Sequence, residues 1–104
     1  MLEICRSFFN HLNSNNIRYC HWKSNVRLEQ ALEGKTDLDI LVHPDDRGKL
    51  ETGVTIFDIK RVLSHRLKRV PDIEDYLGFD HDTGRMIHLH VHFQLILGQK
   101  CHFA

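Results

Sequence analysis

The apolar positions in the first third of the chain predict a helix, a strand and a second helix. Apolar side chains recur at helical spacing over residues 2–12, and an Asn-rich stretch at residues 13–16 ends that helix. Residues 17–23 alternate and carry aromatic side chains, which predicts a strand. A short helix is expected over residues 26–34, because a Ser-Asn pair precedes it as a cap and a glycine closes it.

The next apolar run, residues 37–42, predicts a strand that is charged at its start. Its alternation separates two faces, with Leu38, Ile40 and Val42 on one and Asp37, Asp39 and Leu41 on the other. Residues 44–53 predict a third helix, because a proline suits its first position and acidic residues follow in its first turn.

The second half of the chain predicts mainly strands. Residues 54–60 resemble a strand, whereas residues 61–69 are compatible with a strand, a loop or a helical turn. Two clearer strands, residues 73–79 and 85–97, are joined by the turn-forming sequence Asp-His-Asp-Thr-Gly. The order helix, strand, helix, strand, helix and then several strands predicts an α+β fold, with helices packed on one face of a mixed β-sheet.

Length and charge restrict the class of protein. A chain of 104 residues predicts a single domain, residues 1–104. It carries 14 basic and 14 acidic residues, so there is no excess of Lys and Arg to neutralise phosphates. We therefore expect neither general nucleic-acid binding nor membrane binding. The basic residues within 60–69 leave two interpretations open, a local phosphate-binding patch or a solvated sheet edge.

Cysteine use and the N-terminal sequence favour a cytoplasmic location. The three cysteines are far apart and odd in number, which indicates neither a disulfide framework nor a four-cysteine zinc site. The first residues lack the basic start and apolar core of a signal peptide, and no run approaches the length of a membrane span.

Asp37 and Asp39 are the first candidates for chemistry. Both lie on one face of the predicted strand, so their carboxylates point the same way and repel each other. A divalent cation relieves this repulsion, and Mg²⁺ binds one or two carboxylates while keeping water and phosphate oxygens in its shell. Lys35 and Thr36, directly before them, could approach a phosphate. The alternative is a solvated strand end without a ligand.

His88, His90 and His92 alternate along the last predicted strand, so the three imidazoles lie on one face. Three interpretations are open: a half-polar sheet face, a role beside the two aspartates, or an independent site for Zn²⁺, Mn²⁺ or Ni²⁺. Neighbouring positions on one face of a strand are about 7 Å apart, so two imidazoles can share a metal and a third needs a bend or another strand. His21 is expected in the core or at the sheet edge, and His43 could line the same cleft.

The sequence YCHWKSNVRLEQALEGKTDLDILV, residues 19–42, resembles the nucleotidyltransferase superfamily typified by DNA polymerase beta, which includes aminoglycoside nucleotidyltransferases. Members carry a strand, a small pair such as Gly-Ser that opens a short helix, and Asp-x-Asp on the next strand. The likeness is closest to bacterial nucleotidyltransferase-like proteins, some linked to polysaccharide biosynthesis, and extends over residues 17–97. It implies a nucleotidyltransferase-like fold, a nucleoside triphosphate substrate with Mg²⁺ or Mn²⁺, and transfer of a nucleotidyl group to a hydroxyl acceptor.

Carried over by position, the resemblance implies that Asp37 and Asp39 are the metal-binding carboxylates. Lys23, Ser24 and Asn25 stand where the family has its small pair. The resemblance then implies that this segment binds the nucleotide, with Ser24 on the phosphates and Lys23 assisting.

The last strand departs from the family pattern. The family has Asp-apolar-His there, and its aspartate is a metal ligand or general base. Here the sequence IHLHVHF places His88 at the aspartate position and His90 on the family's histidine. An imidazole can accept a proton at neutral pH, but it is a poorer Mg²⁺ ligand than a carboxylate. Many relatives also have a following helical domain, which here is absent or lies on a partner chain or a missing segment.

The sequence leaves three functions in competition. The first is a nucleotidyltransferase in which Asp37 and Asp39 hold the metal and His88 or His90 acts as base. The second is a catalytically degenerate relative, a binding or regulatory module that forms a homo-oligomer or pairs with a partner chain. The third is a His-based metal-binding protein unrelated to nucleotides.

Overall fold

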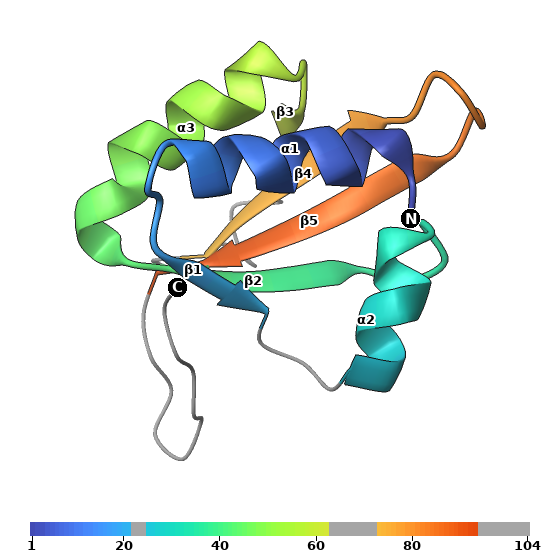
Figure 1. The fold of residues 1–104 in the computed structure, drawn as a ribbon, viewed down its shortest axis with the longest axis horizontal. Helices are drawn as coiled ribbons and strands as arrows, with labels where there is room; N and C mark the ends of the chain where they lie inside the picture. Colours follow the sequence, from blue (N-terminus) through green and yellow to red (C-terminus); the bar gives the residue numbers. More distant parts are fainter. Residues whose placement is uncertain (22–24, 63–72, 94–104) are drawn as a thin grey trace.

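A five-stranded mixed sheet forms the centre of the fold (Figure 1). The computed structural model describes residues 1–21, 25–62 and 73–93, with only the backbone of residues 25–27. Its elements, in chain order, are α1 (Glu3–Ser14), β1 (Tyr19–His21), α2 (Asn25–Leu32), β2 (Leu38–Val42), the 3₁₀ helix η1 (Pro44–Asp46), α3 (Arg47–Ile56), β3 (Lys60–Val62), β4 (Ile73–Phe79) and β5 (Met86–His92).

The strand order brings distant parts of the sequence together. The strands lie in the order β1-β2-β5-β4-β3. Strands β2 and β5 are parallel, and every other neighbouring pair is antiparallel. The strand that follows Asp37 therefore lies directly beside the strand that carries the alternating histidines. The expected mixed sheet and α+β class are confirmed.

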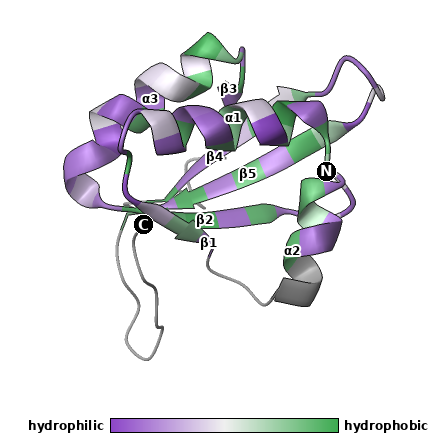
Figure 2. Cartoon of the chain, in the orientation of Figure 1, coloured by the Kyte–Doolittle hydropathy of each residue, from purple (hydrophilic) through white to green (hydrophobic). Residues whose placement is uncertain are grey.

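Helices α1 and α3 cover one face of the sheet (Figure 1). The strands alternate between hydrophobic and hydrophilic residues, as expected when one face is buried (Figure 2). Helix α1 buries Cys5, Phe8, Phe9 and Leu12, and the ring of Phe8 meets that of Phe57 edge to face at 6.1 Å between centroids. The sheet contributes fully buried side chains to the same core: Leu38, Ile40, Val42, Ile87, Leu89 and Val91.

One expected strand is wrong. Residues 54–60 were expected to be extended, but α3 continues to Ile56 and β3 comprises only Lys60–Val62. The physical reason is the burial of Leu50, Gly53 and Val54, which follows the i, i+3, i+4 spacing of a helix face. Helix α3 ends at Ile56, and the chain then turns at Asp58, whose φ of 56° lies in the left-handed region. The other predicted helices and strands are present, most of them with different bounds: the third helix begins as the 3₁₀ helix η1, and the strand expected over residues 85–97 is β5, which ends at His92.

Two buried carboxylates tie the helices to the strands. Asp46 accepts hydrogen bonds from the backbone N–H of Arg18 at 2.9 Å and from its Nε and Nη2 atoms at 2.9 and 3.2 Å. These bonds lower the pKa of Asp46 from 3.8 to about 2. On β4, burial raises the pKa of Glu74, but hydrogen bonds from Tyr76 and from Arg47 of α3 outweigh it and the pKa is lowered.

The hairpin between β4 and β5 also anchors α1. The buried carboxylate of Asp80 accepts hydrogen bonds from the backbone N–H and the hydroxyl of Thr83 and from the backbone N–H of Ile4. The hydrogen bond from the Thr83 hydroxyl, followed by that from Ile4, lowers the pKa of Asp80. The turn that the sequence predicted is thus confirmed, and it supplies a cap for the start of α1.

The cysteines differ from one another. Cys5 is buried and free, and burial raises the pKa of its thiol to about 11. Cys20 is disulfide-bonded. A disulfide on Cys20 weakens the inference of a reducing compartment that was drawn from the number and spacing of the cysteines. Among the described residues, no helix combines the length and the apolar character needed to cross a membrane.

Candidate functional site

The candidate site lies on the sheet face opposite α1 and α3. In the parallel pairing of β2 with β5, Asp39 is opposite His90. The preceding pair, Leu38 and Leu89, is buried in the core. Successive side chains of a strand point to opposite faces, so the aspartates and the alternating histidines share the second face. The sequence predicted these two sets separately, and the strand order places them together.

The first group on this face comprises Asp37, His88 and His90. The Oδ1 atom of Asp37 lies 3.3 Å from Nδ1 of His88, and its Oδ2 atom lies 3.2 Å from Nε2 of His90. The two imidazole rings are 4.2 Å apart between centroids, with 37° between their planes. One ligand atom from each residue lies within 4.8 Å of the others. The geometry therefore joins one carboxylate and two imidazoles around a single point.

Asp75 of β4 approaches the other ring nitrogen of His90, Nδ1. It is directly opposite His90 in the antiparallel pairing of β4 with β5, and its Oδ1 atom lies 2.6 Å from Nδ1 of His90. Oδ1 is nevertheless buried without a hydrogen-bond partner, so the contact is a close approach of a carboxylate to an imidazole. His90 is thus flanked by a carboxylate at each ring nitrogen.

A second pair lies one step further along the same strands. Nε2 of His92 lies 3.1 Å from Oδ1 of Asp39, and the Asp39 side chain is only 8% exposed. Asp37, by contrast, is 57% exposed. Both aspartates therefore have an imidazole nitrogen within 3.3 Å, and their predicted role as a metal-binding pair stays a prediction. Each faces imidazoles, because β5 runs beside β2 in the same direction.

A cavity of about 360 Å³ opens beside the two aspartates. In the described part of the chain, β1 pairs with β2 from Tyr19, opposite Val42, to His21, opposite Ile40, and the cavity lies near the start of β2. The cavity occupies this region and is lined by residues of β1, α2 and the start of β2: His21, Leu28, Gln30, Ala31, Thr36, Asp37, Leu38 and Asp39. It has both an apolar wall and a carboxylate rim.

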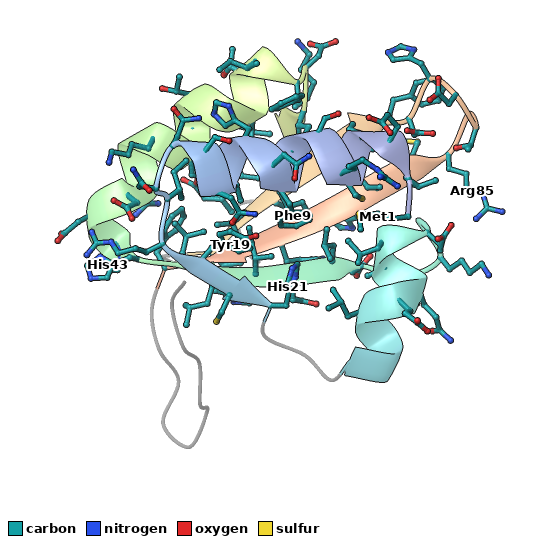
Figure 3. The ribbon with its side chains drawn as sticks, in the orientation of Figure 1. Met1, Phe9, Tyr19, His21, His43 and Arg85 are labelled. Carbon is teal, nitrogen blue, oxygen red and sulfur yellow. The ribbon has the colours of Figure 1, made fainter. Side chains whose placement is uncertain are left out.

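His21 forms the β1 wall of this cavity. Its ring lies 4.8 Å from that of Phe9, and Figure 3 shows it on β1 beneath α1. Burial lowers the pKa of His21, so the ring stays neutral over a wider pH range than an exposed histidine. Its Nδ1 atom is buried without a hydrogen-bond partner among the described residues. The expectation of a core or sheet-edge position is confirmed.

The phosphate-binding residues expected from the sequence are only partly placed. Thr36 is exposed and lines the cavity beside Asp37, whereas Lys35 lines a different hollow that contains Glu29 and Glu33. Asn25 begins α2, but its side chain is not among those described.

Lys23 and Ser24 lie outside the described residues, as does most of the basic stretch 60–69. His43, which was expected beside the cleft, accepts a hydrogen bond through Nδ1 from the backbone N–H of Asp45 at the start of η1.

Sequence reasoning missed Asp75. Its signal was present in the hairpin, because a turn that pairs Asp80 with Arg85 fixes the register of both strands. Counting back from that pair places Asp75 opposite His90, as the structure has it. Asp75 also sits among apolar residues that alternate along β4, where an acidic side chain is unexpected.

Comparisons of the chain with protein-family models, with curated proteins and with solved structures found no match.

Proposed function

We propose that this chain is a nucleotidyltransferase-like domain that binds a nucleoside triphosphate with a divalent metal ion and transfers its nucleotidyl group to a hydroxyl acceptor. The observation that carries the proposal is the parallel pairing of β2 with β5, which gathers Asp37, His88 and His90 at one point beside a cavity. The Asp-x-Asp strand, the short helix before it and the adjacent strand with a third ligating position follow the arrangement implied by the resemblance.

The residues on the open face fit a divalent metal ion. Asp37 offers an exposed carboxylate, and His88 and His90 offer ring nitrogens at 3.3 and 3.2 Å from it. A bound ion of this kind neutralises phosphate charge and favours attack on phosphorus. Because Asp37 is exposed, phosphate oxygens can approach the same point from solvent.

The cavity supports a nucleotide as the ligand. Its volume of about 360 Å³ falls within the roughly 300 to 1,000 Å³ that small-molecule sites span. Leu28, Ala31 and Leu38 supply an apolar wall, while Thr36 and Asp37 form a polar rim next to the metal-binding group. We place the nucleoside against the wall and the phosphates at the rim.

The proposed reaction is a displacement at the α-phosphorus. The acceptor hydroxyl oxygen forms a bond to that phosphorus, the bond from it to the bridging oxygen breaks, and pyrophosphate leaves with the electron pair. The hydroxyl proton passes to the Asp39–His92 pair, the second hydrogen-bonded carboxylate and imidazole on this face. This assignment replaces His88 or His90 as the base, because both of those rings face Asp37.

Calorimetric titration with a panel of nucleoside triphosphates tests the proposal. Wild-type protein in Mg²⁺ or Mn²⁺ should show saturable binding, and the double variant Asp37→Asn/Asp39→Asn should show none. The double variant Asp45→Asn/Asp82→Asn removes the same two charges from exposed positions away from the site and serves as the matched control. If none of the triphosphates binds with either metal, the proposed function is wrong for this chain.

A second candidate is a degenerate relative that binds nucleotide without turning it over. The observation in its favour is at His88, which stands where the resemblance expects a carboxylate and faces the same point as Asp37. Pyrophosphate release in the presence of small hydroxyl acceptors separates the two candidates. Binding with no release from any acceptor favours the module, whereas release that depends on Asp37 favours the enzyme.

A further inference from the structure

We infer that Asp37, His88 and His90 bind a divalent transition metal ion, Zn²⁺ or Co²⁺, in preference to Mg²⁺, and that Asp75 positions His90 for this role. The inference deepens the proposed function. Only the role of the metal in nucleotidyl transfer rests on that proposal. The binding itself is argued from the contacts of these four residues.

The spacing of the ligand atoms suits a first-row metal ion. Metal–ligand bonds near 2.1 Å in a tetrahedral arrangement place neighbouring ligand atoms about 3.4 Å apart. The separations from Asp37 to His88 and to His90 are 3.3 and 3.2 Å, and all three ligand atoms lie within 4.8 Å of one another. The two separations that involve Asp37 thus match those expected around one ion.

The surroundings of His90 point to a cation beside its Nε2 atom. A neutral imidazole carries one N–H, so it can donate a hydrogen bond to only one of the two carboxylates beside it. Oδ2 of Asp37 lies within hydrogen-bond distance of Nε2, 3.2 Å away, whereas Oδ1 of Asp75 has no hydrogen-bond partner. A metal ion held by Nε2 and the Asp37 carboxylate would leave the ring N–H on Nδ1, beside the Asp75 carboxylate.

Asp75 has the position of an outer-sphere partner. Histidines that bind metals usually direct their other ring nitrogen at a carboxylate or a carbonyl, which fixes the tautomer and the ring orientation. Asp75 meets this description, because it comes from the neighbouring strand β4 and approaches the nitrogen of His90 that faces away from Asp37. Its Oδ1 atom, buried without a hydrogen bond, then has a role that the sheet alone does not give it.

The donor set favours a transition metal. Two imidazoles and one carboxylate suit Zn²⁺ and its neighbours, whereas Mg²⁺ prefers six oxygen ligands. Asp37 and His88 are 57% and 37% exposed, so the side of the site that faces solvent is accessible. Three protein ligands with an accessible fourth position are typical of catalytic zinc sites, where water or a substrate oxygen completes the shell.

Metal titration of the full chain without nucleotide tests the inference. We would measure Zn²⁺ affinity by competition with a chelating dye and record the visible spectrum of the Co²⁺ form. Wild-type protein should bind Zn²⁺ at least a hundredfold more tightly than Mg²⁺. Asp37→Asn and His90→Ala should each weaken Zn²⁺ binding tenfold or more. His81→Ala, which removes an exposed histidine from the hairpin, should leave the affinity unchanged.

Asp75→Asn distinguishes positioning from ligation. This variant should weaken Zn²⁺ binding by roughly 10- to 100-fold, the usual cost of losing an outer-sphere partner, while the Co²⁺ spectrum keeps its shape. Loss of the Co²⁺ bands in Asp75→Asn, or equal affinity in wild type and Asp75→Asn, would overturn its assigned role. If His90→Ala does not fold, Asp37→Asn carries the test, because its side chain is mostly exposed.

The outcomes separate this inference from the proposed function. Zn²⁺ binding that depends on Asp37 and His90, without any nucleotide binding, supports the metal site and contradicts the nucleotidyltransferase proposal. Nucleotide binding with Mg²⁺, and no preference for Zn²⁺, overturns the inference and leaves the proposed function standing. Zn²⁺ affinity that is equal in wild type, Asp37→Asn and His90→Ala also overturns the inference.

Discussion

The Nε2 atom of His90 lies 3.2 Å from the Oδ2 atom of Asp37, although 53 residues separate them in the sequence. The contact depends on the parallel pairing of β2 with β5, which no local pattern specifies. It turns two weak signals, an Asp-x-Asp and a run of alternating histidines, into one group of ligands. The proposed function and the inferred metal site both follow from this juxtaposition.

Asp46 should make the fold sensitive to acid. Its pKa is lowered from 3.8 to about 2 by hydrogen bonds from Arg18, so the charged form stabilises the folded state above the unfolded pKa. This contribution is full above about pH 4 and is lost as the pH falls towards 2. Allowing for the partial exposure of Arg18, we expect Asp46→Asn to lower the free energy of unfolding at pH 7 by about 1–2 kcal/mol.

Chemical denaturation between pH 2 and 7 measures this effect. The Asp46→Asn variant should have a flatter profile than wild type between pH 4 and 2. Asp45→Asn, at an exposed neighbouring position, is the control and should follow the wild-type profile. Parallel profiles for wild type and Asp46→Asn would rule out the assigned role.

His21 should make stability depend on pH in a different window. Burial lowers its pKa below the usual 6.5, so the unfolded chain binds a proton at a higher pH than the folded one. Stability is therefore greatest above about pH 6.5 and decreases as the pH falls below it. In His21→Gln this slope should be smaller, by up to about 1.4 kcal/mol per pH unit, in urea denaturation from pH 5 to 8. An unchanged slope would contradict the account.

Gly78 should not tolerate a side chain. A Cβ atom there would meet side-chain carbons of Ile4, Ile59 and Ile87 at 3.0, 3.1 and 3.1 Å. Overpacking of this kind costs about 1–3 kcal/mol, so Gly78→Ala should lower the free energy of unfolding by that amount. Gly48→Ala is the matched control, because a Cβ there meets nothing within 4 Å and lies in the helix α3.

The control should change stability in the opposite direction. Alanine is favoured over glycine in a helix by about 0.5–1 kcal/mol, so Gly48→Ala should raise the melting temperature while Gly78→Ala lowers it. Thermal unfolding of the two variants checks this. Destabilisation of similar size in both would mean that the space around Gly78 is not as described.

Much of the fold could be predicted from the sequence, because its signals are local. The apolar periodicity of α1 and the turn before β5 fix the first residue of each element within one residue. The prediction of a strand that begins at Val54 was wrong, because a helix end followed by a short strand has the same run of apolar residues as one strand. Periodicity over so few residues cannot separate the two.

The candidate site was predictable in its parts but not in its arrangement. Asp37 and His90 were identified from their own strands, but their contact depends on which strands are neighbours. The pairing of Asp39 with His92 was missed for the same reason. Asp75 could have been found from the hairpin register, because that register depends only on a short turn.

The most direct test of the site is NMR of the histidine ring C–H signals during a titration with Mn²⁺, whose unpaired electrons broaden nearby resonances. The account predicts that the signals of His88 and His90 broaden first, at low Mn²⁺, while those of His11 and His81 remain sharp. In Asp37→Asn this selective broadening should be lost. Uniform broadening of all histidines, or broadening centred on histidines away from Asp37, would contradict a metal site on this face of the sheet.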